Sequence, residues 1–114
     1  MNAVIENSYG KIEFSENALK QIVGTLVSES YGIVGVSAKG DGIAELLKRD
    51  NVAKGVKISV EDNKLNIELS VIVKYGVSIK TVAENIIDNV KFAVQEATSL
   101  EIDSLNVVVQ GIRI

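Results

Sequence analysis

The residues most suggestive of chemistry form a glycine-rich segment that runs from Gly32 to Gly42. Within it, Gly35 and Gly40 have the spacing of the glycines in a phosphate-binding P-loop. Asp41 stands where that loop needs its lysine, and a carboxylate there would repel the phosphates. We therefore interpret these glycines as turn residues that flank a buried strand, not as a nucleotide site.

The same segment contains the bare GXXG spacing of a KH domain, whose loop clamps a nucleic-acid backbone. It spans Gly32 to Gly35, but its middle residues are apolar, whereas a KH loop joins two helices and carries basic residues. The net charge of −3 also argues against a general nucleic-acid binder. A positive island at Lys48, Arg49, Lys54 and Lys57 keeps RNA binding open, although these cations equally suit a solvated helix end.

No combination of side chains predicts catalysis, a cofactor or a bound metal. The chain has no histidine and no cysteine, which removes the commonest general base and the commonest ligands of transition metals. Its carboxylates, such as Glu61 and Asp62 at a predicted hairpin tip, lack the spacing of a calcium loop. Ser15 and Ser78 fit helix caps better than nucleophiles, so we predict that the protein is not an enzyme.

One side chain breaks the pattern of the element that carries it. Residues 79 to 97 follow a helical apolar period, and Phe92 falls on the opposite side, among polar residues. A lone exposed aromatic is common in soluble proteins, but it can also contact a partner or a second copy. We take Phe92 as the candidate interaction residue, extended by Val108 on the outer face of the last strand.

Length and composition predict one small domain with a core of valine, isoleucine and leucine, since 46% of the 114 residues are hydrophobic and few are aromatic. No apolar run reaches the ~20 residues of a membrane-spanning helix. The first residues lack the basic and apolar blocks of a secretion signal. We therefore expect a cytoplasmic protein with a flexible N-terminus at residues 1–8 and a single domain over residues 9–114.

The hydrophobic periodicity predicts an α+β fold in the order β-α-β-α-β-β-α-β. Its sheet must be mixed or antiparallel, with the helices packed on one face. A change of phase after Gly111 predicts a bulge in the last strand. The predicted strands are residues 11–14, 32–39, 56–61, 64–74 and 102–112, and the predicted helices are residues 16–30, 43–49 and 78–97.

The central hairpin can be read in register. With Asp62–Asn63 as its turn, Glu61 pairs with Lys64. The apolar residues of the two strands then face one another, and on the other side Lys57 lies opposite Glu68. A slip of one residue would spoil both faces, so this register is strongly specified.

Two stretches of the chain carry a family pattern: Tyr9-Gly10-Lys11-Ile12 near the start, and Val82-Ala83-Glu84-Asn85-Ile86 with Leu105-Asn106-Val107-Val108-Val109-Gln110-Gly111-Ile112 near the end. Over about residues 9–112 the chain resembles the alkaline shock protein family, the Gls-type or YloU-type envelope stress response proteins. Family members often have glycine at the helix-to-strand junction. This chain has Ser99 there, which argues against a left-handed glycine cap.

The resemblance implies a small bacterial protein of the envelope stress response, with no known catalytic site. Relatives tend to self-assemble, and some associate with the inner side of the cell membrane through a separate membrane-anchor protein. We therefore expect a non-enzymatic homo-oligomer that acts by protein–protein contacts and does not itself insert into the membrane. The alternative is a small KH-like RNA-binding module that uses Gly32–Gly35 and the Lys48–Lys57 basic island. A third possibility is an accessory subunit of a lipid-related or kinase-type enzyme.

Overall fold

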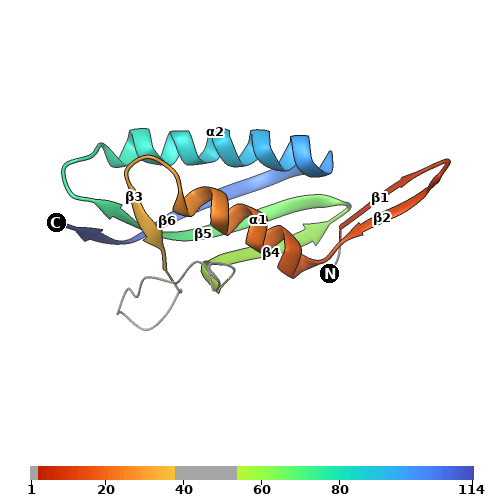
Figure 1. The fold of residues 1–114 in the computed structure, drawn as a ribbon, viewed down its shortest axis with the longest axis horizontal. Helices are drawn as coiled ribbons and strands as arrows, with labels where there is room; N and C mark the ends of the chain where they lie inside the picture. Colours follow the sequence, from red (N-terminus) through yellow and green to blue (C-terminus); the bar gives the residue numbers. More distant parts are fainter. Residues whose placement is uncertain (1–2, 38–53) are drawn as a thin grey trace.

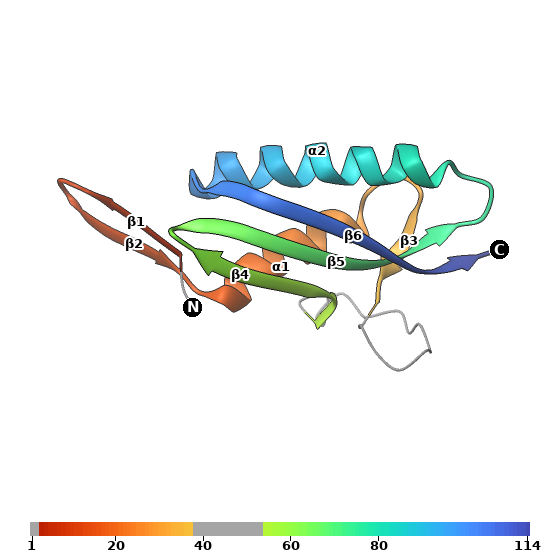
Figure 2. The ribbon, with the colours of Figure 1, turned by 180° about the vertical axis from the view of Figure 1, so that it is seen from behind.

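The computed structural model describes residues 3–37 and 54–114, which form a single α+β domain (Figure 1). Both helices lie on one face of the main sheet, and the view from behind shows the opposite face without a helix (Figure 2). The elements in chain order are β1 (Ala3–Asn7), β2 (Gly10–Phe14), α1 (Glu16–Ser28), β3 (Ile33–Val36), β4 (Val56–Glu61), β5 (Lys64–Lys74), α2 (Ile79–Thr98) and β6 (Glu101–Arg113).

The main sheet is built around β5. Along one edge β5 pairs with β6 in parallel. Along its other edge it pairs antiparallel with β4 near its start and with β3 near its end. The sheet is therefore mixed, as the sequence predicts. The hairpin register is also confirmed, because Glu61 pairs with Lys64 and Lys57 with Glu68.

Each helix begins at a serine cap and buries one stripe of apolar side chains. Ser15 Oγ accepts a hydrogen bond of 3.0 Å from the backbone N–H of Ala18, and Ser78 Oγ accepts one of 3.3 Å from Thr81. In α2 the buried residues recur every four positions, so one side of the helix faces the sheet. The core is aliphatic, and its fully buried members include Leu19, Val23, Val27, Leu65, Leu69, Val71, Val82, Ile86, Val90 and Val94.

Two bulges keep β6 in phase with the core. The register of β5 against β6 shifts twice, which leaves Asp103 and Gln110 as extra residues without a partner. The first shift brings both Ile102 and Leu105 to the face that packs against the core. The second bulge lies one residue before the predicted position at Gly111, and the first was not predicted.

The strand at the start of the chain was also not predicted. Residues 3–7 form β1, which pairs with β2 in a two-stranded sheet that projects from the body (Figures 1 and 2). Asn63 in the β4–β5 turn ties this hairpin to the body: its Oδ1 accepts from the backbone N–H of Val4 at 3.1 Å, and its Nδ2 donates to the Val4 carbonyl at 2.8 Å. Residues 1–8 thus contain regular structure, and their flexibility stays a prediction.

Two further expectations concern the segment after α1. Regular alternation along the strand predicted at residues 32–39 would put Val34 and Val36 on one face, but a bulge at Val34 places Ile33 and Val36 in the core instead. The predicted helix at residues 43–49 lies outside the described residues.

Ser99 ends α2 in the left-handed conformation, with φ of 59°. Its backbone N–H donates to the carbonyl of Gln95 at 2.8 Å. The expectation against a left-handed cap without glycine is therefore wrong: the cap is present, and serine carries its backbone strain.

Gly32 and Gly76 form a matched pair for a test of close packing. Both have positive φ, of 78° and 90°, but a Cβ on Gly32 would lie 2.5 Å from Val82 Cγ2, whereas a Cβ on Gly76 would meet nothing within 4 Å. We expect Gly76→Ala to lower the free energy of unfolding by about 1 kcal/mol through backbone strain alone. Gly32→Ala should cost about 3 kcal/mol, because overpacking adds to the strain. Equal losses in urea unfolding would contradict the close contact.

The cap at Ser99 gives a second stability test. Ser99→Gly relieves the left-handed strain in the folded state. Glycine also makes the unfolded chain more flexible, which offsets part of this gain. We therefore expect the free energy of unfolding to rise by about 0.5 kcal/mol. Ser99→Ala keeps the strain and should not stabilise the protein. The reverse order of the two variants in thermal unfolding would show that Ser99 does not hold a strained cap.

Candidate interaction surfaces

Phe92 lies on the outer side of α2, away from the sheet, and 68% of its surface is exposed. The residues one turn before and after it, Asp88 and Glu96, are exposed and charged. The opposite side of the helix already supplies the core through Val90 and Val94. Within the described part of the chain, Phe92 therefore takes no part in the core, which agrees with its place outside the apolar period.

Val108 does not share this surface. In β6 it pairs with Ser70 of β5, and its neighbours Val107 and Val109 pack against the core on the helix side. Successive side chains of a strand point to opposite faces, so Val108 lies on the face that the helices leave open. It is half-buried there. The structure thus places the two predicted interaction residues on opposite sides of the molecule.

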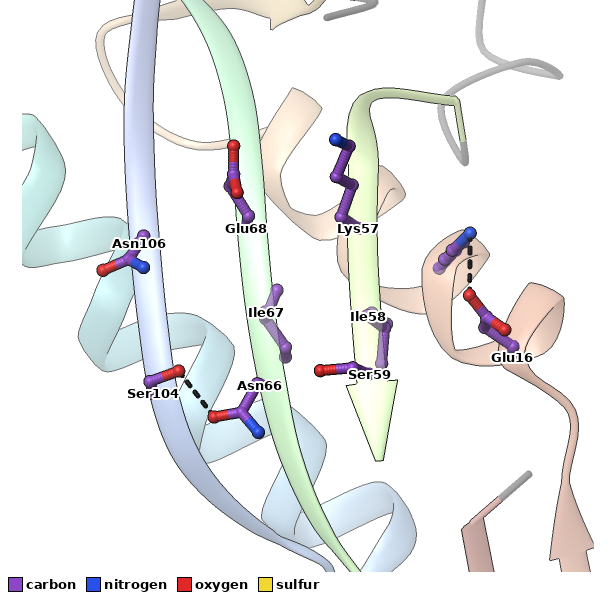
Figure 3. Close-up of a pocket in the computed structure, with 10 residues that line it drawn as sticks. Glu16, Lys57, Ile58, Ser59, Asn66, Ile67, Glu68, Ser104 and Asn106 are labelled. Atoms are coloured by element: carbon purple, nitrogen blue, oxygen red, sulfur yellow. Dashed lines mark hydrogen bonds and ion pairs between the residues drawn. The ribbon is translucent and has the colours of Figure 1, made fainter. Parts of the chain in front are cut away.

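The open face of the sheet carries a shallow groove of about 470 Å³, in which polar side chains from β4, β5 and β6 lie in rows (Figure 3). Ser104 Oγ donates a hydrogen bond of 2.7 Å to Asn66 Oδ1 across β6 and β5. At the side of the groove, Lys20 Nζ lies 3.1 Å from Glu16 Oε1 on α1. Hydrogen bonding and charge attraction from Lys20 lower the pKa of the Glu16 carboxyl.

The groove contains hydroxyl, amide, ammonium and carboxylate groups, but no side chain that its neighbours activate as a nucleophile. Ser59 and Ser104 have no histidine to serve as their base, since the chain contains none. Within residues 3–37 and 54–114, no three acidic side chains gather where they could hold a metal ion. These features are typical of the solvated face of a sheet that packs helices on its other side only.

The structure also corrects the reading of the glycine pair as a KH loop. Gly32 lies in the turn before β3, Gly35 lies within β3, and both residues are buried. A KH loop would instead join two helices and expose its backbone to nucleic acid. Lys54 and Lys57 of the basic island are exposed, and its other two cations, Lys48 and Arg49, lie outside the described residues.

Exposed tyrosines are the surface feature that sequence reasoning missed. Tyr9, Tyr31 and Tyr75 are the three tyrosines of the chain, and each is strongly exposed. Each also precedes a glycine with positive φ, so each sits where the chain turns. The repeated Tyr-Gly pair was the available signal, because turns lie at the surface. Tyr9 marks the tip of the β1–β2 hairpin, and Tyr31 and Tyr75 mark turns beside β3 and β5.

Neither helix in the described part of the chain is long and apolar enough to cross a membrane. No solved structure matches this chain.

Comparison with known proteins identifies relatives over the whole domain. YloU of Bacillus subtilis, an uncharacterized protein, is 34% identical over 117 residues, which cover all of this chain and 98% of YloU. The uncharacterized protein Spy1614 of Streptococcus pyogenes serotype M6 is 33% identical over all of this chain and 97% of its own length. A stress response regulator gls24 homolog of Streptococcus pyogenes serotype M3 is 24% identical over 91% of this chain and 59% of that protein.

A family model covers nearly the same range. The model of the alkaline shock protein 23 family, described by its cell envelope-related function, matches residues 4–114. This match confirms the alkaline shock resemblance that the apolar and glycine positions indicate. The chain therefore belongs to the alkaline shock protein 23 family, whose function is related to the cell envelope.

Proposed function

We propose that this protein is a non-enzymatic scaffold of the cell-envelope stress response that acts through self-association and protein–protein contacts. The family description supports the link to the envelope, and the name of the gls24 homolog supports the link to stress. In this proposal the protein lies in the cytoplasm at the inner face of the cell membrane, where a separate membrane-anchor protein holds it.

The observation that carries the proposal is the exposure of Phe92. A phenylalanine that is 68% exposed on the outer side of a 20-residue helix leaves most of an aromatic ring in water. Burial of such a side chain is worth about 1.5–3 kcal/mol, and aromatic residues are frequent among the dominant contacts of interfaces. A contact there stabilises an assembly without any change in the core, because Val90 and Val94 pack on the other side.

The surroundings of Phe92 suit an interface that can form and separate. Asn85, Asp88, Gln95 and Glu96 are exposed around it on the same side of α2. An aromatic centre within a polar rim is the usual anatomy of a protein–protein contact. The polar rim also suits a chain that is not assembled, since the apolar patch exposed at Phe92 is then small.

Substitution of Phe92 by serine tests this proposal. We expect Phe92→Ser to weaken self-association about tenfold or more, because the apolar contact at the centre of the interface is lost. Stability should change by less than about 0.5 kcal/mol, as for an exposed side chain away from the core. Sedimentation velocity of the full chain over a hundredfold range of concentration measures the first effect, and urea unfolding measures the second.

Gln95→Ser is the matched control, since Gln95 is exposed on the same helix and lies three residues away. It should leave self-association unchanged within about twofold. If the Phe92→Ser variant assembles and captures partner proteins as well as the wild-type chain does, Phe92 is not an interaction residue.

A further inference from the structure

The β1–β2 hairpin, which we call the arm, stands apart from the main sheet as a ribbon of two strands (Figures 1 and 2). An isolated two-stranded hairpin is only marginally stable in water, and further strands or a covering helix stabilise it. The base of the arm has such support, because Ile5 and Phe14 pack against the core. Ile12 is the register partner of Ile5 and lies on the same face, yet 54% of its surface is exposed.

The two edges of the arm differ. On the outer edge of β1, the side chain of Asn63 accepts a hydrogen bond from the backbone N–H of Val4 and donates one to the Val4 carbonyl. In the part of the chain that the structure describes, no strand lies along the outer edge of β2. Such an edge is a template on which another strand can pair. The edge of β2 is therefore the one open to a further strand.

The bonds to Asn63 also show which residues of β2 direct their backbone groups outward. In an antiparallel pair of strands, residue pairs that bond across alternate with pairs that do not. Val4 directs its backbone groups to Asn63, away from β2, so Val4 and its register partner Glu13 do not bond across. The same holds for Lys11, two residues earlier in β2. Lys11 and Glu13 thus direct their N–H and C=O groups to the open edge.

The sequence of β2 is complementary to itself in antiparallel pairing. With Ile12 at the centre, Lys11 of each copy faces Glu13 of the other. Opposite charges directly across a strand pair stabilise it. On the other face of the arm, the two Ile12 side chains meet, and Phe14 lies opposite Gly10, where an aromatic ring covers the glycine. No pair in this register brings like charges together.

We propose that the arm binds a second copy of this chain edge to edge through β2, so that two arms form one antiparallel sheet in the order β1-β2-β2-β1. This inference rests on the proposed function and deepens it, because it adds a self-association surface separate from Phe92. Lys11 and Glu13 form the hydrogen-bonded pairs across the new edge, and Ile12 lies at the two-fold axis. The bodies of the two copies lie at opposite ends, since the tip of each arm meets the base of the other.

The pattern of β2 favours a second copy over an unrelated strand as the occupant. The charges on either side of Ile12 are opposite, so the strand matches its own inverse. β1 lacks this property, because self-pairing about Ile5 would set the apolar Val4 against Glu6. Edges of five residues bury less surface than a standard protein–protein interface, so we expect a weak pair that is best detected by trapping.

A single cysteine traps this contact, because the chain has none of its own. In the paired arms the two Ile12 residues do not bond across, and their Cα atoms lie about 4.5 Å apart, within the range that a disulfide spans. Ile12→Cys should therefore form a disulfide dimer of the full chain under mild oxidation. Tyr9→Cys is the control, since Tyr9 is 98% exposed but its two copies would lie about 20 Å apart. We expect Ile12→Cys to form dimers at least about tenfold faster.

Charge variants of the Ile12→Cys chain test the register. Glu13→Lys makes the open edge wholly positive, and Glu6→Lys/Lys11→Glu makes it wholly negative while it keeps opposite charges across the hairpin. Either chain alone should form dimers about tenfold more slowly, because like charges then face one another. An equal mixture of the two should restore the rate through mixed dimers. Lys80→Glu, at the far end of the molecule, should change the rate by less than about twofold.

Two results would overturn the inference: equal rates for Ile12→Cys and Tyr9→Cys, or no recovery of the rate in the mixture. Thermal unfolding shows whether each variant folds, and the comparison of the two cysteine variants remains decisive if a charge variant does not. If the arms fail to cross-link while Phe92-dependent self-association persists, the arm contact alone is wrong and the proposed function stands. If the arms cross-link and Phe92→Ser has no effect on assembly, the arm contact stands and the Phe92 surface is wrong.

Discussion

The pairing of β4 with β5 fixes which side chains of this protein face the helices and which face water. β5 forms hydrogen bonds along both edges, so its position also sets those of β3 and β6. A slip of one residue between β4 and β5 would turn Val60 and Ile58 to the solvent and bring Lys57 to the core. The core, the two helices above it and the polar open face all depend on this register.

Much of this sheet and of the helices that cover it could be predicted, because the hydrophobic and charge patterns of the sequence agree with one another. The β4–β5 register satisfies the apolar and the charged face at once, and the buried stripe of α2 repeats every four residues. The bulges at Val34 and Asp103 were not predicted. One extra residue shifts the alternation of side chains between the two faces of a strand, and no particular residue type signals it in the sequence. β1 escaped because its pairing with β2 and Asn63 involves backbone groups that hydrophobic periodicity does not reveal.

The surface was less predictable than the core for a geometric reason. Sequence periodicity places Phe92 on the outer side of its own helix, and the structure agrees. Periodicity cannot relate one element to another, so it did not show that Val108 lies on the opposite side of the molecule. Tyr31, Tyr75 and Arg113 likewise come near one another only once the turn before β3 and the end of β6 have both joined the end of β5.

The central claim is that this domain works through its outer surface and not through the groove of its open sheet face. Amide chemical shifts of the ¹⁵N-labelled chain, followed as its concentration rises, test this claim directly. The account predicts concentration-dependent shifts centred on Phe92 and its exposed neighbours on α2, with constant shifts for Asn66, Glu68 and Asn106 in the groove. Shifts that begin in the groove, or spectra that do not change with concentration, would contradict it.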